Sequence, residues 1–424
     1  DSLLPIICKI VNRSLETSNV PENYKQAVVS PLIKKPSLDN ENMKNYRPVS
    51  NLPYISKLLE KIVIKQFNTH IETHGLREPL QSAYLEKHST ETALIKVFND
   101  ILCAIDNHQC VLLVLLDLSA AFDTIDHDMM LSRLEELFGV SGDALAWFKS
   151  YFSGRSQKIV LNDASSTSVP LSTGVPQGSV AGPGTFTAYT KPIGGIARKH
   201  GVNLHLYADD TQLYVGCHLK DQDLTKQQLE SCVEEVRRWM ANNMLKLNDG
   251  KTEYMILGSK HALRNLHETM NNITIGEEKI QMAPSARNIG VFMDTALDMD
   301  EQVAHICRAC YMAIRDIGKI RNYLTEKSTT QLVIAFVMSK LDCNNALLYK
   351  CKKYLLEKLQ LVQNNAARII ARKRKHDSIE HIRKELHWLP IEFRIEYKIN
   401  LMTFKCQNNL APSYLSNLLI PHNP

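Results

Sequence analysis

The sequence predicts an α+β fold, and two observations lead to that prediction. Strand-like runs occur in the middle of the chain: "VLLVLL" (residues 111–116) is continuously apolar, and "VNLHLYADDTQLYV" (residues 202–215) is two apolar runs that meet at a tight polar junction, as in a β-hairpin. From Asp300 onward, in contrast, apolar residues recur almost entirely at helical intervals. The sequence shows no internal repeat, so a mixed core followed by a helical region fits better than a solenoid.

The segments before residue 111 are predicted to be mostly helical, with one interruption. "SPLIKKPSLDNENMKNYRPVSNLP" contains four prolines that break any helix, so we expect an irregular basic loop there. "YISKLLEKIVIKQFNTHI", which follows this loop, has the spacing of an amphipathic helix.

Helices and strands are both predicted between residues 111 and 294. Strand-like patterns occur in "SQKIVLN" and at residues 253–257 and 288–293, and "STGVPQGSVAGPGTF" is a Gly/Pro-rich loop that enters a helix. Three further segments have helical patterns: "DHDMMLSRLEELFGV", "DALAWFKSYFSG" and "KDQDLTKQQLESCVEEVRRWMANNML".

The length and composition limit the class of protein. A chain of 424 residues allows about two to three domains, and no apolar run approaches the roughly 18 residues that a membrane span needs. The ten scattered cysteines fit a reducing intracellular compartment. Because the chain starts at Asp1 without a methionine, we expect a fragment that lacks its natural N-terminus and any targeting signal. Cys307 and Cys310 have CxxC spacing, but their helical surroundings favour a structural pair over a metal site.

Charge is unevenly distributed along the chain. The total is +5, yet the part from Lys340 to the end has 15 Lys and Arg against 7 Asp and Glu, which is +8 and leaves −3 for the rest. A basic tail suggests an anionic partner, most simply nucleic acid. For "ARKRKHDSIEHIRKE" (residues 371–385), a helix with a solvated charged face explains the composition equally well.

Three carboxylates are candidates for a metal site. Asp209 and Asp210 are adjacent at the hairpin junction and repel each other unless a cation such as Mg²⁺ neutralises them, although Asp is also a common turn residue. Asp117 follows six apolar residues, where a charge is unfavourable unless it is paired or metal-bound, or caps a helix. Carboxylates from adjacent strand ends can hold two divalent ions about 4 Å apart, which activates an attacking hydroxyl and stabilises a departing phosphate oxygen.

A series of motifs runs through the chain in a characteristic order: "NYRPVSNLPYISKLLEKIV", "HSTETAL", "VLLDLSAAFDTIDH", "GVPQGSV", "LYADDTQLY", "LKLNDGKTEYMILG", "NIGV" and the tail "LHWLPIEFRIEYKINLMTFKCQNNLAPSYLSNLL". Together they resemble a reverse transcriptase, and the whole is similar to the polymerase of a LINE-type, non-LTR retrotransposon. The likeness covers nearly the entire chain, and several ordered motifs are far more specific than any one of them.

The resemblance implies an RNA-directed DNA polymerase of right-hand architecture, with a core at about residues 25–294. It would consist of an N-terminal extension and fingers at residues 1–110, a palm of antiparallel sheet plus helices with fingers insertions at 111–294, a helical thumb at 295–340, and a basic helical C-terminal extension at 341–424. The extension would bind template RNA.

The resemblance also assigns catalytic roles. Phe122 matches a bulky residue under the sugar of the incoming nucleotide, which leaves no room for a 2′-OH; core packing is the alternative. Lys251 matches a lysine thought to protonate the leaving pyrophosphate, although an isolated lysine is usually just solvated. The implied ligands of two Mg²⁺ ions, which Mn²⁺ could replace, are Asp117, Asp209 and Asp210, and the Y-x-D-D box is completed by Tyr207 and Ala208.

Binding roles follow from the same resemblance. Gln177 and Gly178 match a loop that lies against the template and the incoming base, and Gly290 matches the turn that holds the primer end. The residues matching the grip on the triphosphate are Arg47 and one of Lys34 and Lys35. The tail residues expected to bind RNA are Arg372, Lys373, Arg374 and Lys375.

One segment departs from the family's pattern. After "GVPQGSV" the family usually has leucines where this chain has Ala181, Gly184 and Thr185. The replacements remove apolar contacts from a helix expected to pack beneath the catalytic hairpin, at a few kcal/mol each if these sites are buried, and a glycine inside the helix adds about 1 kcal/mol. A catalytically impaired relic that retains RNA binding is therefore the alternative to an active polymerase.

The implied partners are template RNA, a DNA primer and deoxynucleoside triphosphates, with no membrane. The resemblance implies an upstream endonuclease domain in the full-length element, and a location in the nucleus and cytoplasm. A viral RNA-dependent RNA polymerase would share the palm and the paired aspartates, but Phe122 and the tail argue against it.

Overall fold

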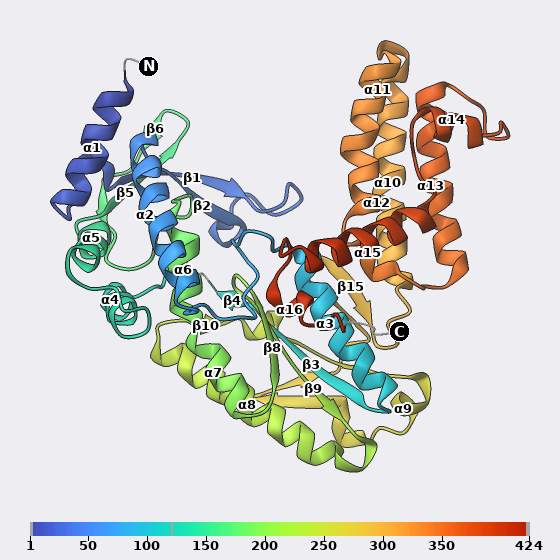
Figure 1. Ribbon diagram of the computed structural model, residues 1–424, viewed down its shortest axis with the longest axis horizontal. Helices are drawn as coiled ribbons and strands as arrows, with labels where there is room; N and C mark the ends of the chain where they lie inside the picture. The colour runs from blue at the N-terminus through green and yellow to red at the C-terminus, as the bar shows by residue number, and fades with distance from the viewer. Residues whose placement is uncertain (1–2, 120–121, 421–424) are drawn as a thin grey trace. The chain divides into compact units, whose positions relative to one another are not determined.

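The computed structural model describes residues 3–119 and 122–420, which form two compact units. Unit 1 comprises residues 1–84, 116–201 and 231–251, and unit 2 comprises residues 85–115, 202–230 and 252–424. Each unit is thus built from three separate stretches of the chain. The predicted mixture of helices and sheets is confirmed in both (Figure 1).

Unit 1 is built around a five-stranded sheet of order β2-β1-β5-β6, with β7 also paired to β5. Its strands are β1 (Gln26–Ile33), β2 (Tyr46–Asn51), β5 (Ser156–Leu161), β6 (Ala164–Ser165) and β7 (Val169–Pro170). A short ladder joins β4 (Leu118–Ser119) to β10 (Lys246–Leu247). The helices are α1 (Leu4–Glu16), α2 (Tyr54–Thr73), α4 (His127–Glu136), α5 (Gly142–Phe152), α6 (Ala181–Thr190) and α7 (Pro192–Lys199).

The irregular loop expected between residues 30 and 53 is confirmed only in part: residues 30–33 and 46–51 belong to the antiparallel hairpin of β1 and β2, and residues 34–45 connect the two strands. Pro31 and Pro48 lie directly opposite each other, and the Lys34 N–H donates to Asn45 O at 2.8 Å. In an antiparallel ladder, hydrogen-bonded and non-hydrogen-bonded residue pairs alternate. Because Lys34 and Asn45 form a hydrogen-bonded pair, Pro31 and Pro48 form a non-hydrogen-bonded pair, in which neither residue donates an N–H to the other strand. The pairing of β1 with β5 ends at Val29, before the first proline. Proline is therefore tolerated in both strands.

Unit 2 contains a four-stranded sheet of order β11-β3-β9-β8. Its strands are β3 (Cys110–Leu116), β8 (Asn203–Tyr207), β9 (Asp210–Cys217) and β11 (Glu253–Leu257). The predicted hairpin is confirmed as β8 and β9, and the strand predicted at residues 253–257 is confirmed as β11. Two further hairpins join β12 (Asn272–Ile275) to β13 (Glu278–Gln281) and β14 (Ser285–Asn288) to β15 (Val291–Asp294).

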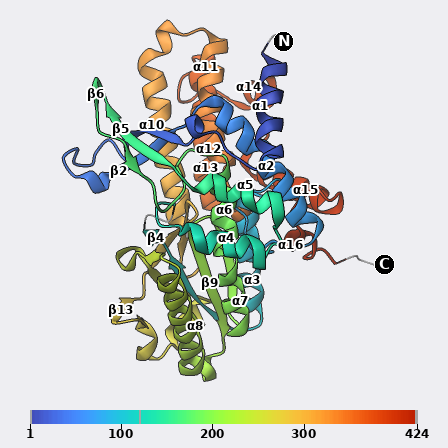
Figure 2. The ribbon, with the colours of Figure 1, turned by 90° about the vertical axis from the view of Figure 1, so that its left-hand side faces the viewer.

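Helices make up the rest of unit 2, as predicted for the region after Asp300. They are α3 (Thr90–Asp106), α9 (Lys260–Arg264), α10 (Asp300–Ile320), α11 (Glu326–Val333), α12 (Ser339–Asp342), α13 (Lys353–Ala371), α14 (Glu380–Glu385), α15 (Ile391–Gln407) and α16 (Ser413–Ser416). α8 (Gln222–Asn242) contributes residues to both units. α10, α11 and α13 run side by side (Figure 1, Figure 2). No helix in the described part of the chain has both the length and the apolar character needed to cross a bilayer.

A single apolar core runs from the sheet of unit 2 into its C-terminal helices. It includes Leu94 of α3, Val111 of β3, Val303 of α10, Val362 of α13 and Ile395 of α15, all almost completely buried. The C-terminal extension is therefore an integral part of unit 2 rather than an appended tail. Removing it would expose much of this core.

Candidate functional site

The turn between β8 and β9 carries the paired aspartates. Tyr207 pairs with Asp210, so Ala208 and Asp209 form a two-residue loop. Ala208 has a φ of 58°, a left-handed conformation that glycine usually supplies at such turns. For alanine this conformation costs roughly 1 kcal/mol, so the flanking strands must hold the turn in shape.

Asp117 and Lys251, two of the predicted catalytic residues, lie together in unit 1. Lys251 Nζ donates to Asp117 Oδ2 at 2.9 Å, and Asn248 Nδ2 lies 3.3 Å from the same oxygen. The Asn248 backbone N–H also donates to Asp117 O at 2.9 Å. Asn248 was not predicted; the one signal for it was its place three residues before Lys251 in "LNDGK".

The predicted metal ligands fit a divalent cation by their donor chemistry. Carboxylate oxygens are the ligands that Mg²⁺ prefers. The ammonium of Lys251 forms an ion pair with one carboxylate oxygen of Asp117, and about a quarter of the Asp117 side chain remains exposed. Among the residues that the structure describes, no group of three or more His, Cys, Asp or Glu side chains is gathered closely enough to hold a metal ion. Cys307 and Cys310, both within α10, also belong to no such group.

The loop that holds Gln177 and Gly178 is tied to two other parts of unit 1. Gln177 O accepts from the Ser50 N–H of β2 at 2.7 Å, and Gln177 Nε2 donates to both carboxylate oxygens of Asp123 at 3.0 Å. Burial raises the pKa of Asp123, and the Gln177 hydrogen bond opposes that rise. A Cβ on Gly178, which has a φ of 131°, would lie 2.5 Å from Ser50 O, so this position requires glycine.

Phe122 directly precedes Asp123 in the sequence and is hydrogen-bonded to the segment that leads into the Gln177 loop. Its ring stacks on Phe186 of α6 with the ring centroids 4.9 Å apart, and its backbone carbonyl accepts from the Val175 N–H at 2.8 Å. The side chain is only half-buried. The structure therefore joins Phe122, Gln177 and Gly178 around the start of α6.

Glu60 of α2 is a structural residue of this region that was not predicted. Its carboxylate is buried, and its Oε2 accepts from the Val180 and Ala181 N–H groups at 2.6 and 3.0 Å, while Ser56 Oγ donates to Oε1 at 3.2 Å. The charge thus caps the N-terminus of α6 directly after the Gln177 loop. In the sequence Glu60 is indistinguishable from any charged residue of an amphipathic helix.

The predicted triphosphate-binding residues lie at the end of the β1–β2 hairpin that carries its connecting loop. Arg47 is exposed on β2 opposite Leu32. Lys34 Nζ donates to Lys44 O at 2.7 Å, which fastens the connecting loop, and Lys35 is exposed. Because the Lys34 ammonium is engaged by Lys44 O, the exposed Lys35 is the better candidate of the two lysines. Arg47 is an exposed guanidinium suited to phosphate.

The segment that departs from the family's pattern forms α6, which packs on α2 and α4. Ala181 and Thr185 are completely buried, and the Thr185 hydroxyl donates to Ala181 O and Gly182 O. Its hydroxyl is therefore satisfied, although both side chains are smaller than leucine. A Cβ added at Gly184 would lie 3.7 and 3.8 Å from carbons of Ile64, an ordinary contact distance.

We expect Gly184→Ala to stabilise unit 1 by about 1 kcal/mol, because alanine restricts the unfolded chain and favours a helix interior. The measurement is a denaturant melt of both proteins. Gly182→Ala is the matched control: its Cβ would lie 2.7 Å from Ser179 Oγ, so it should destabilise. Equal shifts in the two variants would contradict the prediction.

The turn predicted to hold the primer end is a tight hairpin loop. Asn288 pairs with Val291, and the loop residues Ile289 and Gly290 have φ values of 43° and 89°. The single strand expected over residues 288–293 is therefore wrong, because this turn divides it between β14 and β15. Asn288 Nδ2 donates to Gln212 Oε1 of β9 at 2.7 Å, and both side chains are buried. This hydrogen bond ties the loop to the strand that begins at Asp210.

The predicted RNA-binding residues of the tail are exposed, but they do not lie on a helix. α13 ends at Ala371, and Arg372 adopts a left-handed conformation with a φ of 52°. The continuous helix considered for residues 371–385 is therefore wrong for this part, because Arg372 to Lys375 form a loop before α14. Next to the loop, the buried Arg321 guanidinium donates to Ile369 O and Ile370 O and caps the end of α13.

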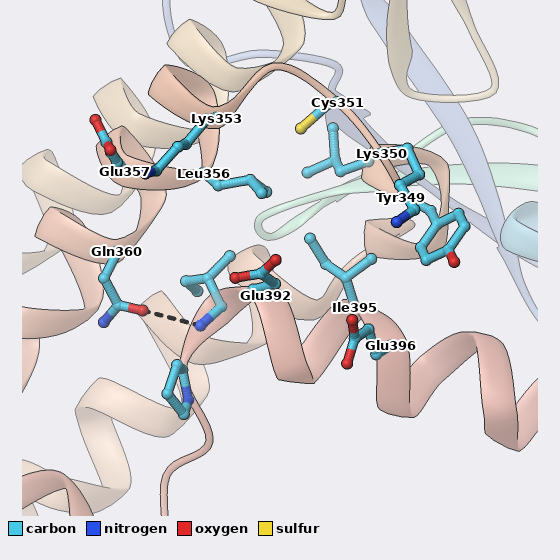
Figure 3. A pocket seen from close by; sticks show the side chains of 13 residues that line it. Tyr349, Lys350, Cys351, Lys353, Leu356, Glu357, Gln360, Glu392, Ile395 and Glu396 are labelled. Atoms are coloured by element: carbon cyan, nitrogen blue, oxygen red, sulfur yellow. Dashed lines mark hydrogen bonds between the residues drawn. The ribbon is translucent and has the colours of Figure 1, made fainter.

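The other end of the extension has a different charge. A pocket of about 380 Å³ opens between α13 and α15, with Leu356 and Ile395 in its wall. Figure 3 shows the carboxylate of Glu392 between these two side chains, with the Gln360 side chain accepting from the Ile391 N–H nearby. Glu357 and Glu396 also line the pocket, as do Lys350 and Lys353. Three carboxylates against two ammonium groups leave the lining slightly negative, so phosphate fits the four cations of the loop of Arg372 to Lys375 better than this pocket.

Comparison with known proteins gives consistent results. Residues 33–291 match the family described as reverse transcriptase (RNA-dependent DNA polymerase). The chain is 25% identical over 328 residues to a probable RNA-directed DNA polymerase from transposon BS of Drosophila melanogaster, covering 76% of this chain and 35% of the relative. It is 25% identical over 386 residues to a probable RNA-directed DNA polymerase from transposon X-element of the same organism, covering 86% and 39%.

A third relative and one solved structure complete the comparison. The RNA-directed DNA polymerase from mobile element jockey of Drosophila melanogaster is 22% identical over 315 residues, covering 73% of this chain and 33% of the relative. The chain thus spans between 33% and 39% of the length of these three relatives. The structure of apo telomerase from Candida Tropicalis has a TM-score of 0.46 and 10% identity, covering 98% of this chain and 74% of that one.

Proposed function

Because the chain belongs to the reverse transcriptase (RNA-dependent DNA polymerase) family, we propose that it extends a DNA primer on an RNA template as the polymerase of a non-LTR retrotransposon. Its curated relatives are named as RNA-directed DNA polymerases of transposons and mobile elements. The nicking of a chromosomal target is proposed to belong to another part of the full-length element.

The observation that carries this proposal is the direction of two neighbouring strands in unit 2. β3 lies beside β9, and Gln109, just before β3, is hydrogen-bonded to His218, just after β9, at 3.0 Å. The strands are therefore antiparallel, and the last residue of β3 and the first of β9 are at the same end of the sheet. Asp117 follows β3 directly, and Asp210 begins β9. On this basis we propose Asp117, Asp209 and Asp210 as the metal ligands.

These carboxylates would hold Mg²⁺ ions, or Mn²⁺ in their place. When bound, the metal would neutralise the three aspartates and act as a Lewis acid on the phosphate oxygens. Lys251 would release Asp117 and keep its proton on Nζ, where it can be donated to the leaving pyrophosphate. Arg47 and Lys35 would bind the triphosphate, and Gln177 and Gly178 would face the template and incoming base.

The direct test is primer extension by the full chain with Mg²⁺, on RNA and DNA templates of the same sequence. Extension on RNA is the expected result. A catalytically impaired relic is the second candidate, because Ala181 and Thr185 replace larger apolar residues in a buried helix. RNA binding without extension would favour the relic and rule out an active polymerase.

Phe122→Val should raise incorporation of ribonucleotides relative to deoxyribonucleotides by about tenfold or more, because the smaller side chain leaves room for a 2′-OH. The measurement is single-nucleotide extension with each sugar. Phe122→Tyr keeps the ring and should keep the selectivity. Unchanged selectivity in Phe122→Val would place the sugar gate at another residue.

Neutralising Arg372, Lys373, Arg374 and Lys375 to glutamine should flatten the salt dependence of RNA binding. Each lost phosphate contact lowers the slope of log K against log salt by about 0.7 for single strands. A variant that exchanges Arg and Lys at these positions keeps the charge and should keep the slope. If the loop serves only to offset the C-terminal end of the α13 dipole, the neutral variant should lose stability while the slope stays the same.

A further inference from the structure

β8 is an edge strand that needs support from side chains. Among the described strands it pairs with β9 alone, and it leads directly into the strained turn at Ala208 and Asp209. Because an edge strand is hydrogen-bonded to a neighbour on one side only, its position also depends on the side chains that pack on its faces. The residues that pack on β8 therefore influence the geometry of the turn.

The C-terminal segment of the chain supplies part of that packing. Tyr414 of α16 is buried, and its ring meets the ring of His205 in the middle of β8 edge-to-face, with centroids 5.3 Å apart at 87°. Tyr414 Oη donates to Thr92 Oγ1 at 3.2 Å. Thr92 belongs to the capping box that begins α3. Tyr414 thus bridges β8 and the start of α3, and Figure 1 shows α16 beside α3.

His205 is suited to this contact because it is neutral. Burial, together with smaller effects of the nearby Lys96 and His88, lowers the pKa of His205 to about 3. The ring of His88 also packs edge-on against the ring of Tyr414, with centroids 5.6 Å apart. An uncharged imidazole and an aromatic ring form a stable apolar contact with no charge left buried.

Polar bonds fasten the surrounding chain to the same place. Lys87 Nζ donates to Asn409 O at 2.7 Å, ahead of α16. Glu91 of α3 accepts from the Ala346 N–H at 3.2 Å and from Lys398 Nζ at 3.1 Å. The C-terminal extension is therefore held against the start of α3 at several points.

We propose that Tyr414 is a positioning residue: residues 409–416, the C-terminal clasp, hold β8 and thereby fix the turn that carries Asp209 and Asp210. This role in catalysis rests on the proposed polymerase function. Loosening β8 would let the unfavourable conformation of Ala208 relax, and the two carboxylates would move. The competing account is that Tyr414 is an ordinary core residue whose loss weakens unit 2 uniformly.

The test compares Tyr414→Leu, Tyr414→Phe and the wild-type full chain by amide hydrogen exchange and by steady-state primer extension. Losing the edge-to-face contact should raise the equilibrium constant for local opening of β8 about tenfold. Tyr414→Leu should therefore speed amide exchange across β8 by about that factor, and exchange in β12 and β13 should change by less than about twofold. kcat should fall while KM for the nucleotide stays constant. Tyr414→Phe keeps the ring and should restore both.

Tyr397→Leu is the matched control, because Tyr397 lies in α15 of the same extension and is 59% exposed. It should change neither measurement. Unchanged exchange in β8, or equal acceleration in β8 and in β12 and β13, would overturn the clasp. If the wild-type chain itself fails to extend a primer, the proposed function fails, and the exchange measurement still decides whether the clasp holds β8.

Discussion

Asp210→Asn should reduce primer extension by about 10³-fold or more while the fold is unchanged. Losing a carboxylate from a metal site removes several kcal/mol of transition-state charge stabilisation, and about 4 kcal/mol corresponds to that factor. The side chain is half-buried at the start of β9, and asparagine has nearly the same shape. The measurement is the rate of single-nucleotide addition with Mg²⁺, together with a circular dichroism spectrum and a melt.

The matched control is Asp163→Asn, an exposed aspartate in the turn between β5 and β6. It should keep both activity and stability. Asp117→Asn should behave like Asp210→Asn, because both residues are proposed to hold the same metal. If Asp210→Asn kept more than about a tenth of the activity, the carboxylate could not be a ligand whose loss costs several kcal/mol.

Glu60→Ala should destabilise unit 1 by about 3 kcal/mol, because the Val180 and Ala181 N–H groups would lose their buried acceptor. Glu60→Gln keeps one acceptor oxygen and should cost about half as much. Both effects would be measured by denaturant unfolding. Because α6 begins directly after the Gln177 loop, we also expect weaker nucleotide binding in Glu60→Gln at temperatures where it remains folded.

Glu72→Ala provides the comparison within the same helix. The Glu72 side chain is 67% exposed and lies 3.6 Å from Arg77, so its removal should change stability by less than about 0.5 kcal/mol. A loss at Glu60 no larger than that at Glu72 would show that the two N–H groups find another acceptor.

The parts of the fold predicted correctly are those with a local cause. The β8–β9 hairpin follows from apolar runs on both sides of a polar junction, and α10 follows from helical spacing. The β1–β2 hairpin could not be predicted because prolines disfavour strands in general. Pro31 and Pro48 are tolerated only because of their register, which the sequence does not reveal.

The candidate site shows the same division. Asp117 and the aspartate pair stand out because charges at the ends of apolar strands need a reason. Glu60 and Tyr414 do not stand out, since Val180 and Thr92, to which they are hydrogen-bonded, are 120 and 322 residues away in the chain. Arg372 ends α13 without the glycine that normally marks such an end, so the sequence does not separate the basic loop from a helix with a charged face.

The interleaving of the two units has a consequence for synthesis on the ribosome. Unit 1 has all its segments once residue 251 has emerged, whereas unit 2 requires the chain to residue 416 or beyond, where Tyr414 and α16 lie. The strands β3, β8 and β9 are therefore synthesised before the C-terminal helices that cover them, and until then their apolar surface is exposed to water or to chaperones. A premature stop codon between residues 325 and 414 would leave unit 1 able to fold and unit 2 without part of its core. Late nonsense mutations in such a gene should thus be as damaging as changes at the aspartates themselves.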